Sequence, residues 1–305
     1  MTAPDQESQP PLGGASGVSP GTRREADEPG DASRPPTCFR HPGRETYVSC
    51  VRCGRPACPD CLRSAAVGQQ CVECVREGHR TSRPVAAAFG GRPSRSAIVT
   101  WSLIAVNVVI FLAEVSKPSL LYDWGMYGRA VADGQWYRLL TSAFTAPGTS
   151  FGGWGLLDIA FNMWALYFVG PELERLLGPV RYLAVYLLSA IGGAVLFYYL
   201  APDALAAGAS GAVFGLFGAW FVVTRRLRLD TRGIVMLIAI NLIFSFTVRN
   251  IAWQDHLGGL IVGAALTAAY AYAPRKNRAA IQLAATIAVV VILVVAVIIR
   301  NGQLS

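Results

Sequence analysis

The chain contains 305 residues, of which 53% are hydrophobic and 15% are charged, and its mean hydropathy is +0.39. An ordinary soluble domain is roughly a quarter charged, so this composition excludes an intrinsically disordered protein and argues against a single soluble globule. The formal net charge is +8, but the basic residues are scattered and form no contiguous stripe. We therefore expect no nucleic-acid partner.

The N-terminal part of the chain divides into three segments by composition. Residues 1–37 are rich in Pro, Gly, Ser, Asp and Glu without an apolar period, which predicts a disordered leader. Residues 38–79 contain all seven cysteines and predict a compact metal-binding module. Residues 80–96 are basic and contain Gly and Pro, which is typical of a linker close to a membrane surface.

Four pairs of Cys or His residues within this module share a two-residue gap. They are Cys38 with His41, Cys50 with Cys53, Cys58 with Cys61, and Cys71 with Cys74. Such a gap lets both side chains of a turn reach one ion, and four thiolate or imidazole ligands complete a zinc tetrahedron. The pairs therefore predict about two zinc ions, with His79 able to replace Cys71 or Cys74. The pairs can join in interleaved order, first with third and second with fourth, or in sequential order.

A disulfide cluster is the alternative interpretation of the same cysteines. Their odd number and their expected cytoplasmic location both argue against it. The spacing resembles a B-box-like, cross-braced zinc finger over residues 38–79. Because protein ligands fill every coordination position in such a module, we expect it to bind a cytoplasmic protein partner rather than to catalyse a reaction.

Seven apolar stretches follow residue 96 and predict helices at 97–115, 155–170, 180–200, 209–224, 233–248, 255–273 and 279–299. A helix of about 20 residues spans the ~30 Å of bilayer hydrocarbon. The first, third and seventh stretches reach that length, whereas the second and the fourth are short. We therefore predict an all-α polytopic membrane protein with seven transmembrane helices, preceded by the small zinc-binding module.

The distribution of Arg and Lys predicts the orientation in the membrane. With the N-terminus in the cytoplasm, the loops that remain inside carry more cations than those outside, as the positive-inside rule requires. The C-terminus then lies outside, as does a long loop over residues 116–154 that contains several Trp and Tyr residues. Only Lys117 and Lys276 are lysines among the 27 basic residues, a composition that we interpret as bacterial, with the plasma membrane as the location.

Few polar side chains interrupt the apolar stretches. Each ionisable one costs at least ~2.5 kcal/mol at mid-bilayer, so each requires a reason. The polar groups that stand out are Asp158 and Asn162 in the second stretch, Ser210 at the start of the fourth, and Asp255 and His256 at the start of the sixth. All three helices run from outside to inside in the predicted orientation. Their polar groups therefore lie at a similar depth below the outer surface.

Ser210 and His256 form a candidate nucleophile and base. Because the fourth stretch is too short to span the hydrocarbon, we expect Ser210 at a water-accessible depth beside the unpaired N–H groups of a helix N-terminus. Gly259 and Gly263 allow the sixth helix to approach the fourth, which brings a neutral imidazole towards the serine hydroxyl. The alternative for these glycine-rich helices is close packing without catalysis.

Three helix motifs and one loop motif occur in a specific order along the chain. They are Trp136-Tyr137-Arg138, Phe161-Asn162-Met163-Trp164-Ala165-Leu166, Gly208-Ala209-Ser210-Gly211 and Asp255-His256-Leu257-Gly258-Gly259. Together they resemble the rhomboid family of intramembrane serine proteases. The likeness covers residues 97–275, and residues 279–299 match the seventh helix of a six-plus-one arrangement in that family.

The resemblance implies a role for each residue of the candidate site. Ser210 would be the nucleophile and His256 its base, without an orienting carboxylate. Asn162 would stabilise the oxyanion together with the backbone N–H of Ser210, and Phe214 would pack against the base. Asp255, adjacent to His256, points about 100° away on a helix and is poorly placed to orient it.

Two features of the resemblance leave alternatives open. The family commonly has a histidine four residues before Asn162, where this chain has Asp158. An ionised Asp158 would repel the oxyanion, a protonated one would donate a hydrogen bond to it, and a third role would be to orient His256 across the cavity. Trp136 and Arg138 match a pair that shapes the outer loop in the family, and anchoring in the membrane interface is their alternative role.

The function implied by this resemblance is hydrolysis of peptide bonds in or near transmembrane helices of membrane-protein substrates, with no cofactor for the catalysis itself. The alternative is a catalytically inactive rhomboid-like adaptor that binds client helices in the bilayer and a cytoplasmic partner through the zinc module. A small-solute transporter is disfavoured, because the sequence lacks paired interrupted helices and charged midplane residues.

Overall fold

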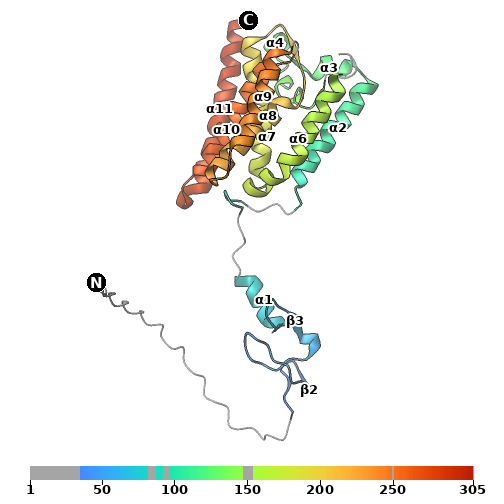
Figure 1. Cartoon of the computed structure of the whole chain (residues 1–305), viewed down its shortest axis with the longest axis vertical. Coiled ribbons are helices and arrows are strands. Elements are labelled where there is room, and N and C mark those ends of the chain that lie inside the picture. The colour runs from blue at the N-terminus through green and yellow to red at the C-terminus, as the bar shows by residue number, and fades with distance from the viewer. Residues whose placement is uncertain (1–34, 82–86, 92–95, 147–153, 249–250, 305) are drawn as a thin grey trace, which may run out of the picture. The chain divides into compact units, whose positions relative to one another are not determined.

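A computed structural model describes residues 35–81, 87–91, 96–146, 154–248 and 251–304 (Figure 1). The chain divides into two compact units, Met1–Arg83 and Pro84–Ser305. The division falls inside the segment that the sequence predicts as a linker. The predicted leader over residues 1–37 lies almost wholly outside the described residues.

The first unit contains two small antiparallel hairpins and one helix. Its elements are β1 (Thr37–Cys38) paired with β2 (His41–Glu45), the 3-10 helix η1 (Pro59–Cys61), β3 (Leu62–Ser64) paired with β4 (Gln69–Cys71), and α1 (Val72–Thr81). Its buried apolar cluster consists of cysteines together with Ala57 and Leu62. Because so small a core stabilises a fold only weakly, bound metal would supply much of the folding free energy of this unit.

The second unit is a bundle of helices that lie side by side (Figure 1). Its long helices are α2 (Ile98–Ser116), α6 (Trp154–Leu177), α7 (Pro179–Leu200), α8 (Ser210–Arg226), α9 (Arg232–Thr247), α10 (Trp253–Tyr272) and α11 (Arg278–Leu304). Its connections contain α3 (Ser119–Trp124), α4 (Gly128–Ala132), α5 (Arg138–Thr141), the antiparallel pair β5 (Met126–Tyr127) and β6 (Leu205–Ala206), and η3 (Arg275–Asn277). Each of the seven predicted apolar stretches is thus helical in the structure.

Three helical segments are long and apolar enough to cross a membrane by length and composition, namely α2, α7 and residues 275–304. Helix α8 has 17 residues and α9 has 16, so both are shorter than a bilayer-spanning helix of average length. Helix α6 is long but carries several charged residues. The structure therefore supports a largely helical membrane protein, and the passage of all seven helices through the bilayer stays a prediction.

Helix α6 is longer than the sequence predicted, and its description as short was wrong. It continues past the expected end at residue 170, through Pro171, to Leu177. In this extension Leu173 and Leu177 are fully buried, whereas Glu172 and Arg175 are paired on the surface. The helix is amphipathic in this extension. Its charged residues interrupt the apolar run in the sequence, but the helix continues through them.

Glu174 connects this extension of α6 to the start of α2. Its buried carboxylate accepts hydrogen bonds from the backbone N–H groups of Val99 at 3.2 Å and Thr100 at 2.9 Å, and from the Thr100 hydroxyl at 2.8 Å. The first N–H groups of a helix have no partner within the helix, and a carboxylate also favours the positive end of the helix dipole. Glu174 therefore caps α2 from a neighbouring helix.

Helices α8 and α10 pack with their backbones in contact. A Cβ atom added at Gly259 would lie 1.9 Å from the carbonyl oxygen of Gly211, and one at Gly263 would lie 2.2 Å from the carbonyl oxygen of Gly215. Only glycine fits at these positions, so the close approach expected from Gly259 and Gly263 is confirmed. This contact holds the first turn of α8 beside the N-terminal half of α10.

Part of the predicted linker at residues 80–96 is packed within the second unit. Phe89 is buried, its N–H donates to the carbonyl of Leu176 at 3.2 Å, and its carbonyl accepts from Gln282 Nε2 at 2.8 Å. Gln282 Nε2 also lies 3.0 Å from the carbonyl oxygen of Tyr270. Residues 87–91 are therefore held in place by hydrogen bonds to α6 and α11, and Gln282 of α11 is in turn bonded to α10.

Candidate active site and metal centre

Ser210 is the first residue of α8 and is half-buried. The chain enters this helix through Gly208, whose φ of +138° is a conformation that L side chains rarely adopt. The N–H of Gly208 donates to the carbonyl of Ser142 at 3.0 Å, which fixes the turn before the helix. The serine therefore lies where backbone N–H groups point outward without helical partners, as the sequence predicted.

His256 lies in the first turn of α10 and is buried. Its ring stacks on Phe214, with ring centroids 4.3 Å apart and an angle of 11° between the planes. Its Nδ1 atom lies 2.7 Å from the hydroxyl oxygen of Ser245 on α9. The contact with Phe214 matches the expectation from the sequence, whereas Ser245 was missed. The sequence feature that could have identified Ser245 is that it is a polar residue within a largely apolar stretch.

The structure brings Ser210 and His256 to the same end of two touching helices. Phe214 follows Ser210 by about one helical turn on α8, and it is Phe214 that contacts the imidazole. Within the described part of the chain, no direct hydrogen bond joins the Ser210 hydroxyl to His256. Catalytic hydrogen bonds are often long before substrate binds, so this arrangement is compatible with a nucleophile and its base.

A small cavity with a mixed polar and apolar lining lies next to Ala209, the residue that precedes Ser210. The polar side chains that line it come from α2, from the segment before residue 147, and from α6, and they are Asn107, Thr145, Asp158 and Asn162. Asn162 Nδ2 donates to the backbone carbonyl of Asp158 at 2.9 Å, so one of its two amide hydrogens is engaged. The Asn162 side chain also forms a hydrogen bond with the Asp158 carboxyl.

Asp158 lies on the same side of the site as Ser210. A Cβ atom added at Gly208 would lie 3.3 Å from Asp158 Oδ2 and 3.4 Å from Ser210 Oγ. Asp158 Oδ2 is buried and has no hydrogen-bond partner within the described residues. The imidazole Nδ1 of His256 lies against Ser245, and no hydrogen bond joins the ring to Asp158 among the described residues, so an orienting role of Asp158 stays an untested prediction.

Asp255 points away from His256, as helical geometry predicted, and connects three helices. Its carboxylate accepts a hydrogen bond from the backbone N–H of Gly211. Cβ atoms added at Gly193 on α7 and at Gly211 on α8 would lie 2.4 and 2.2 Å from its two oxygens. Sequence reasoning missed this role, in which Asp255 caps the helix that begins with Ser210.

Arg138 is a buried organiser of the loop that precedes α6. Its Nη1 atom donates to the carbonyls of Tyr122 at 2.7 Å and Gly125 at 2.8 Å, and its Nε donates to Gln135 Oε1 at 2.6 Å. Only 7% of Arg138 is exposed, so interface anchoring was wrong for this residue. Trp136 is 48% exposed, which leaves interface anchoring open for the tryptophan.

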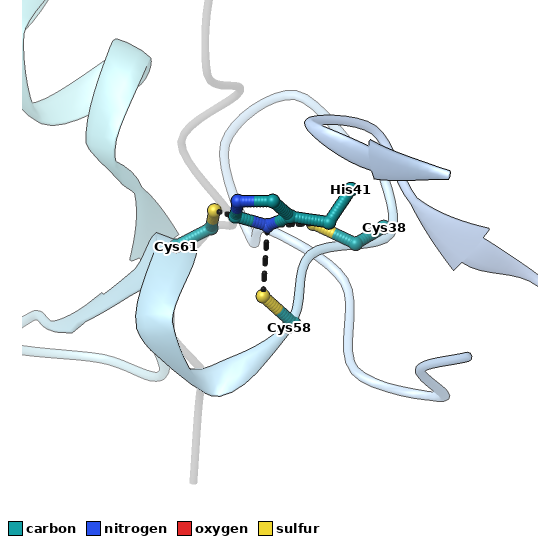
Figure 2. A group of neighbouring side chains, drawn as sticks. All are labelled: Cys38, His41, Cys58 and Cys61. Atoms are coloured by element: carbon teal, nitrogen blue, oxygen red, sulfur yellow. Dashed lines mark hydrogen bonds between the residues drawn. The ribbon is translucent and has the colours of Figure 1, made fainter. Parts of the chain in front are cut away.

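The Cys/His pairs of the first unit assemble into two clusters in interleaved order. One consists of Cys38, His41, Cys58 and Cys61, and the other of Cys50, Cys53, Cys71 and Cys74. Figure 2 shows the first cluster, in which His41 Nδ1 lies 3.4 Å from the sulfurs of both Cys58 and Cys61. Within each cluster, all ligand atoms lie within 4.8 Å of one another.

These clusters fit zinc by chemistry and size. Zn–S bonds of about 2.3 Å in a tetrahedron require ligand atoms roughly 3.8 Å apart, and the Cys53 and Cys71 sulfurs are 3.8 Å apart. All seven cysteines are free thiols, so the disulfide alternative is not supported. The His79 side chain lies outside the described residues, and the second cluster has four ligands without it.

The thiols in each cluster differ in acidity. Burial by itself would raise the pKa of Cys38, but hydrogen bonds from the backbone of Cys58 and Arg40 outweigh it and lower the pKa to about 6. The pKa of Cys50 is likewise lowered to about 6 by backbone donors, including the N–H of Cys71. The pKa of Cys58 in the first cluster and of Cys53 in the second is lowered as well. A thiolate is the species that binds a metal ion, so each cluster holds two thiols prepared for coordination.

Comparison with known proteins decides the family. The rhomboid domain family matches residues 133–273. The rhomboid YdcA of Bacillus subtilis is 37% identical over 143 residues, which are 45% of this chain and 68% of that protein. The chain is a member of the rhomboid family. The match region contains every predicted residue of the candidate active site, and the metal clusters lie outside it.

Two named proteases are also similar to this rhomboid. Rhomboid protease GluP of Bacillus subtilis is 36% identical over 190 residues, covering 58% of this chain and 35% of GluP. Rhomboid protease AarA of Providencia stuartii is 28% identical over 206 residues, covering 57% of this chain and 66% of AarA. This rhomboid thus spans about a third of the length of GluP. Family membership makes it a multi-pass membrane protein and supports intramembrane proteolysis at the level of the family.

Proposed function

We propose that this rhomboid is an intramembrane serine protease in which Ser210 and His256 form a catalytic dyad. The observation that carries the proposal is the stacking of Phe214 on His256, because Phe214 lies one turn after Ser210 on α8. This stacking holds the imidazole beside the helix that Ser210 begins. The proteases GluP and AarA among the relatives support the same chemistry.

In the proposed reaction, His256 accepts the hydroxyl proton of Ser210 while the serine oxygen attacks the scissile carbonyl carbon. The oxyanion accepts hydrogen bonds from the Ser210 N–H and the Asn162 amide, and one such donor is typically worth ~10²–10³ in rate. His256 then gives its proton to the leaving amine as the C–N bond breaks. Water hydrolyses the acyl-enzyme with His256 again as base. None of these steps requires a cofactor.

Asp158 takes part in this proposal at the oxyanion side of the site. Its partnerless carboxylate oxygen lies near Gly208, on the same side as the Ser210 hydroxyl. An ionised carboxylate there would repel the oxyanion, whereas a protonated carboxyl would donate a hydrogen bond to it. We propose the second role.

The substrates in this proposal are membrane proteins cut in or near a transmembrane helix. A helical segment must unwind locally to expose a carbonyl carbon to Ser210, so Gly, Pro and small residues are expected near the cut. The site is proposed to open to the outer face of a bacterial plasma membrane, with the N-terminus in the cytoplasm and the C-terminus outside.

The zinc module is proposed to serve a separate role. Its two clusters would hold about two zinc ions, each with four protein ligands and therefore no open position for catalysis. We propose that residues 38–79 bind a cytoplasmic protein partner.

A fluorophosphonate probe applied to membranes that contain the full chain tests the protease proposal. The wild type should be labelled and should cleave a model transmembrane substrate, whereas Ser210→Ala and His256→Ala should do neither. Ser189→Ala is a matched control, because Ser189 is a fully buried serine of α7 whose hydroxyl has no hydrogen-bond partner among the described residues. Its labelling should equal that of the wild type.

The second candidate function is a catalytically inactive adaptor that binds client helices. The observation that favours it is the carboxyl of Asp158 beside the oxyanion position. Absence of Ser210-dependent labelling, together with cleavage that is unchanged in Ser210→Ala, would replace the protease proposal by the adaptor.

A further inference from the structure

Helix α9 presents a buried hydroxyl to the imidazole of the proposed dyad. Among the residues of α9, only Ile234 and Ser245 are buried, and Ser245 is 3% exposed. The rest of the helix is largely apolar and at least partly exposed, as suits contact with lipid. A polar side chain in such a helix needs a partner, and that partner is His256.

The two hydrogen bonds of Ser245 define where the protons lie. Its oxygen is 2.6 Å from the backbone carbonyl oxygen of Asn241 and 2.7 Å from Nδ1 of His256. A hydroxyl has one hydrogen, and a carbonyl oxygen can only accept. The hydroxyl therefore donates to Asn241, and the contact with the imidazole is satisfied only if Nδ1–H donates to the hydroxyl oxygen. The reverse arrangement would leave two oxygens 2.6 Å apart with no hydrogen between them.

A hydrogen on Nδ1 leaves the lone pair of a neutral imidazole on Nε2. A general base requires that lone pair, and the group that bonds the opposite ring nitrogen sets which nitrogen carries it. The carboxyl groups near the site do not perform this function. Asp255 is engaged with Gly211, and Asp158 makes no hydrogen bond to the ring.

We propose that Ser245 is a positioning residue that holds His256 in the tautomer with hydrogen on Nδ1, so that Nε2 is free to accept the proton of Ser210. This inference rests on the proposed function for its consequence, but the tautomer itself is a property of the resting protein. It assigns to α9 the part that a carboxylate plays in a Ser-His-Asp triad. Because the hydroxyl is neutral, it orients the ring without the charge that would stabilise an imidazolium.

The direct test is a 15N NMR spectrum of the full chain with 15N-labelled histidine in detergent micelles. The chain has three histidines, and the signals of His256 are those that disappear in His256→Ala. The wild type should show a protonated Nδ1 and an unprotonated Nε2 for this residue, and Ser245→Ala should show a mixture of tautomers. A wild-type spectrum with hydrogen on Nε2 would overturn the inference, whatever the variants do.

The kinetic test uses the rate of Ser210-dependent fluorophosphonate labelling. Ser245→Ala should be about five- to tenfold slower than the wild type, which corresponds to the loss of one neutral hydrogen bond. Ser245→Thr, which keeps the hydroxyl, should recover most of that rate. Ser189→Ala controls for removal of a buried serine hydroxyl and should match the wild type.

The outcomes separate this inference from the protease proposal. Equal labelling rates for Ser245→Ala, Ser189→Ala and the wild type would overturn the role of Ser245 while the dyad stands. A wild type that is never labelled, but that shows the expected tautomer, would overturn the dyad and leave the hydrogen-bond assignment in place.

Discussion

The aromatic ring of Phe214 lies nearly parallel to the imidazole of His256, with centroids 4.3 Å apart. The two residues come from α8 and α10, which contact each other through glycines. Stacking on one face and a hydrogen bond at Nδ1 together restrict the rotation of the ring. The base is therefore held by side chains from two other helices.

We expect replacement of Phe214 by Leu to slow Ser210-dependent labelling. An aromatic pair contributes about 0.5–1.5 kcal/mol beyond its buried area, which corresponds to a loss of roughly two- to tenfold. Phe214→Tyr keeps the ring and should retain most of the rate. The measurement is the labelling rate in membranes, with thermal unfolding in micelles to separate misfolding from loss of orientation. A Leu variant that is folded and as fast as the wild type would remove the proposed contribution of stacking.

Asp158→Asn should raise the turnover of a model substrate. The amide has the same size, is neutral, and offers a permanent N–H donor beside the position of Asp158 Oδ2, where a carboxyl donates only when protonated. Complete removal of one oxyanion donor typically lowers the rate ~10²–10³-fold. A carboxyl that donates only in its protonated form loses part of this contribution, so we expect the permanent amide donor to raise turnover by about tenfold.

Two further variants complete this comparison. Asp158→His should also be active, and Asp158→Leu, which offers no donor, should be slower than either. An Asn variant that turns over more slowly than the wild type would show that the carboxyl itself has a positive role.

Removal of the carboxylate of Asp255 should destabilise the folded protein. Its hydrogen bond to the N–H of Gly211 caps α8, and loss of a cap typically costs about 1 kcal/mol. We expect Asp255→Ala to lower the unfolding midpoint in denaturant, measured in micelles by circular dichroism. Asp255→Asn retains an acceptor oxygen and should fall between the Ala variant and the wild type. Equal midpoints for all three would show that the cap carries no free energy.

Metal removal should unfold the first unit as a whole. The clusters are interleaved, so the two ligand pairs of each site lie on either side of one ligand pair of the other site along the chain. We expect about two zinc ions per chain by elemental analysis, and loss of one in Cys58→Ser.

Because each site braces both halves of the module, Cys58→Ser should also make residues 38–79 sensitive to protease throughout. The control is Ser64→Ala at an exposed position of β3, which should keep both ions. If the segment around Cys71 stays resistant to protease in Cys58→Ser, the two metal sites fold independently of each other.

The sequence alone predicted the seven long helices and the Ser, His and Cys residues of the two candidate sites. Long apolar runs predicted helices because each backbone polar group in lipid must be satisfied within its own segment. The two-residue gaps predicted ligand pairs, because that spacing is a local property of a turn. Gly259 and Gly263 predicted a close helix contact, because only small residues allow it.

Only the tertiary structure decided which side chains meet across helices. The bond from Ser245 to His256, the cap that Asp255 forms on α8, and the cap that Glu174 forms on α2 join separate helices. Such contacts depend on how each helix is rotated and how deep it lies relative to its neighbours. The spacing of apolar residues in the sequence does not specify either property. The sequence left the order of the metal ligands open for the same reason. A two-residue gap shows which two ligands bind one ion together, but it does not show which other pair completes that site.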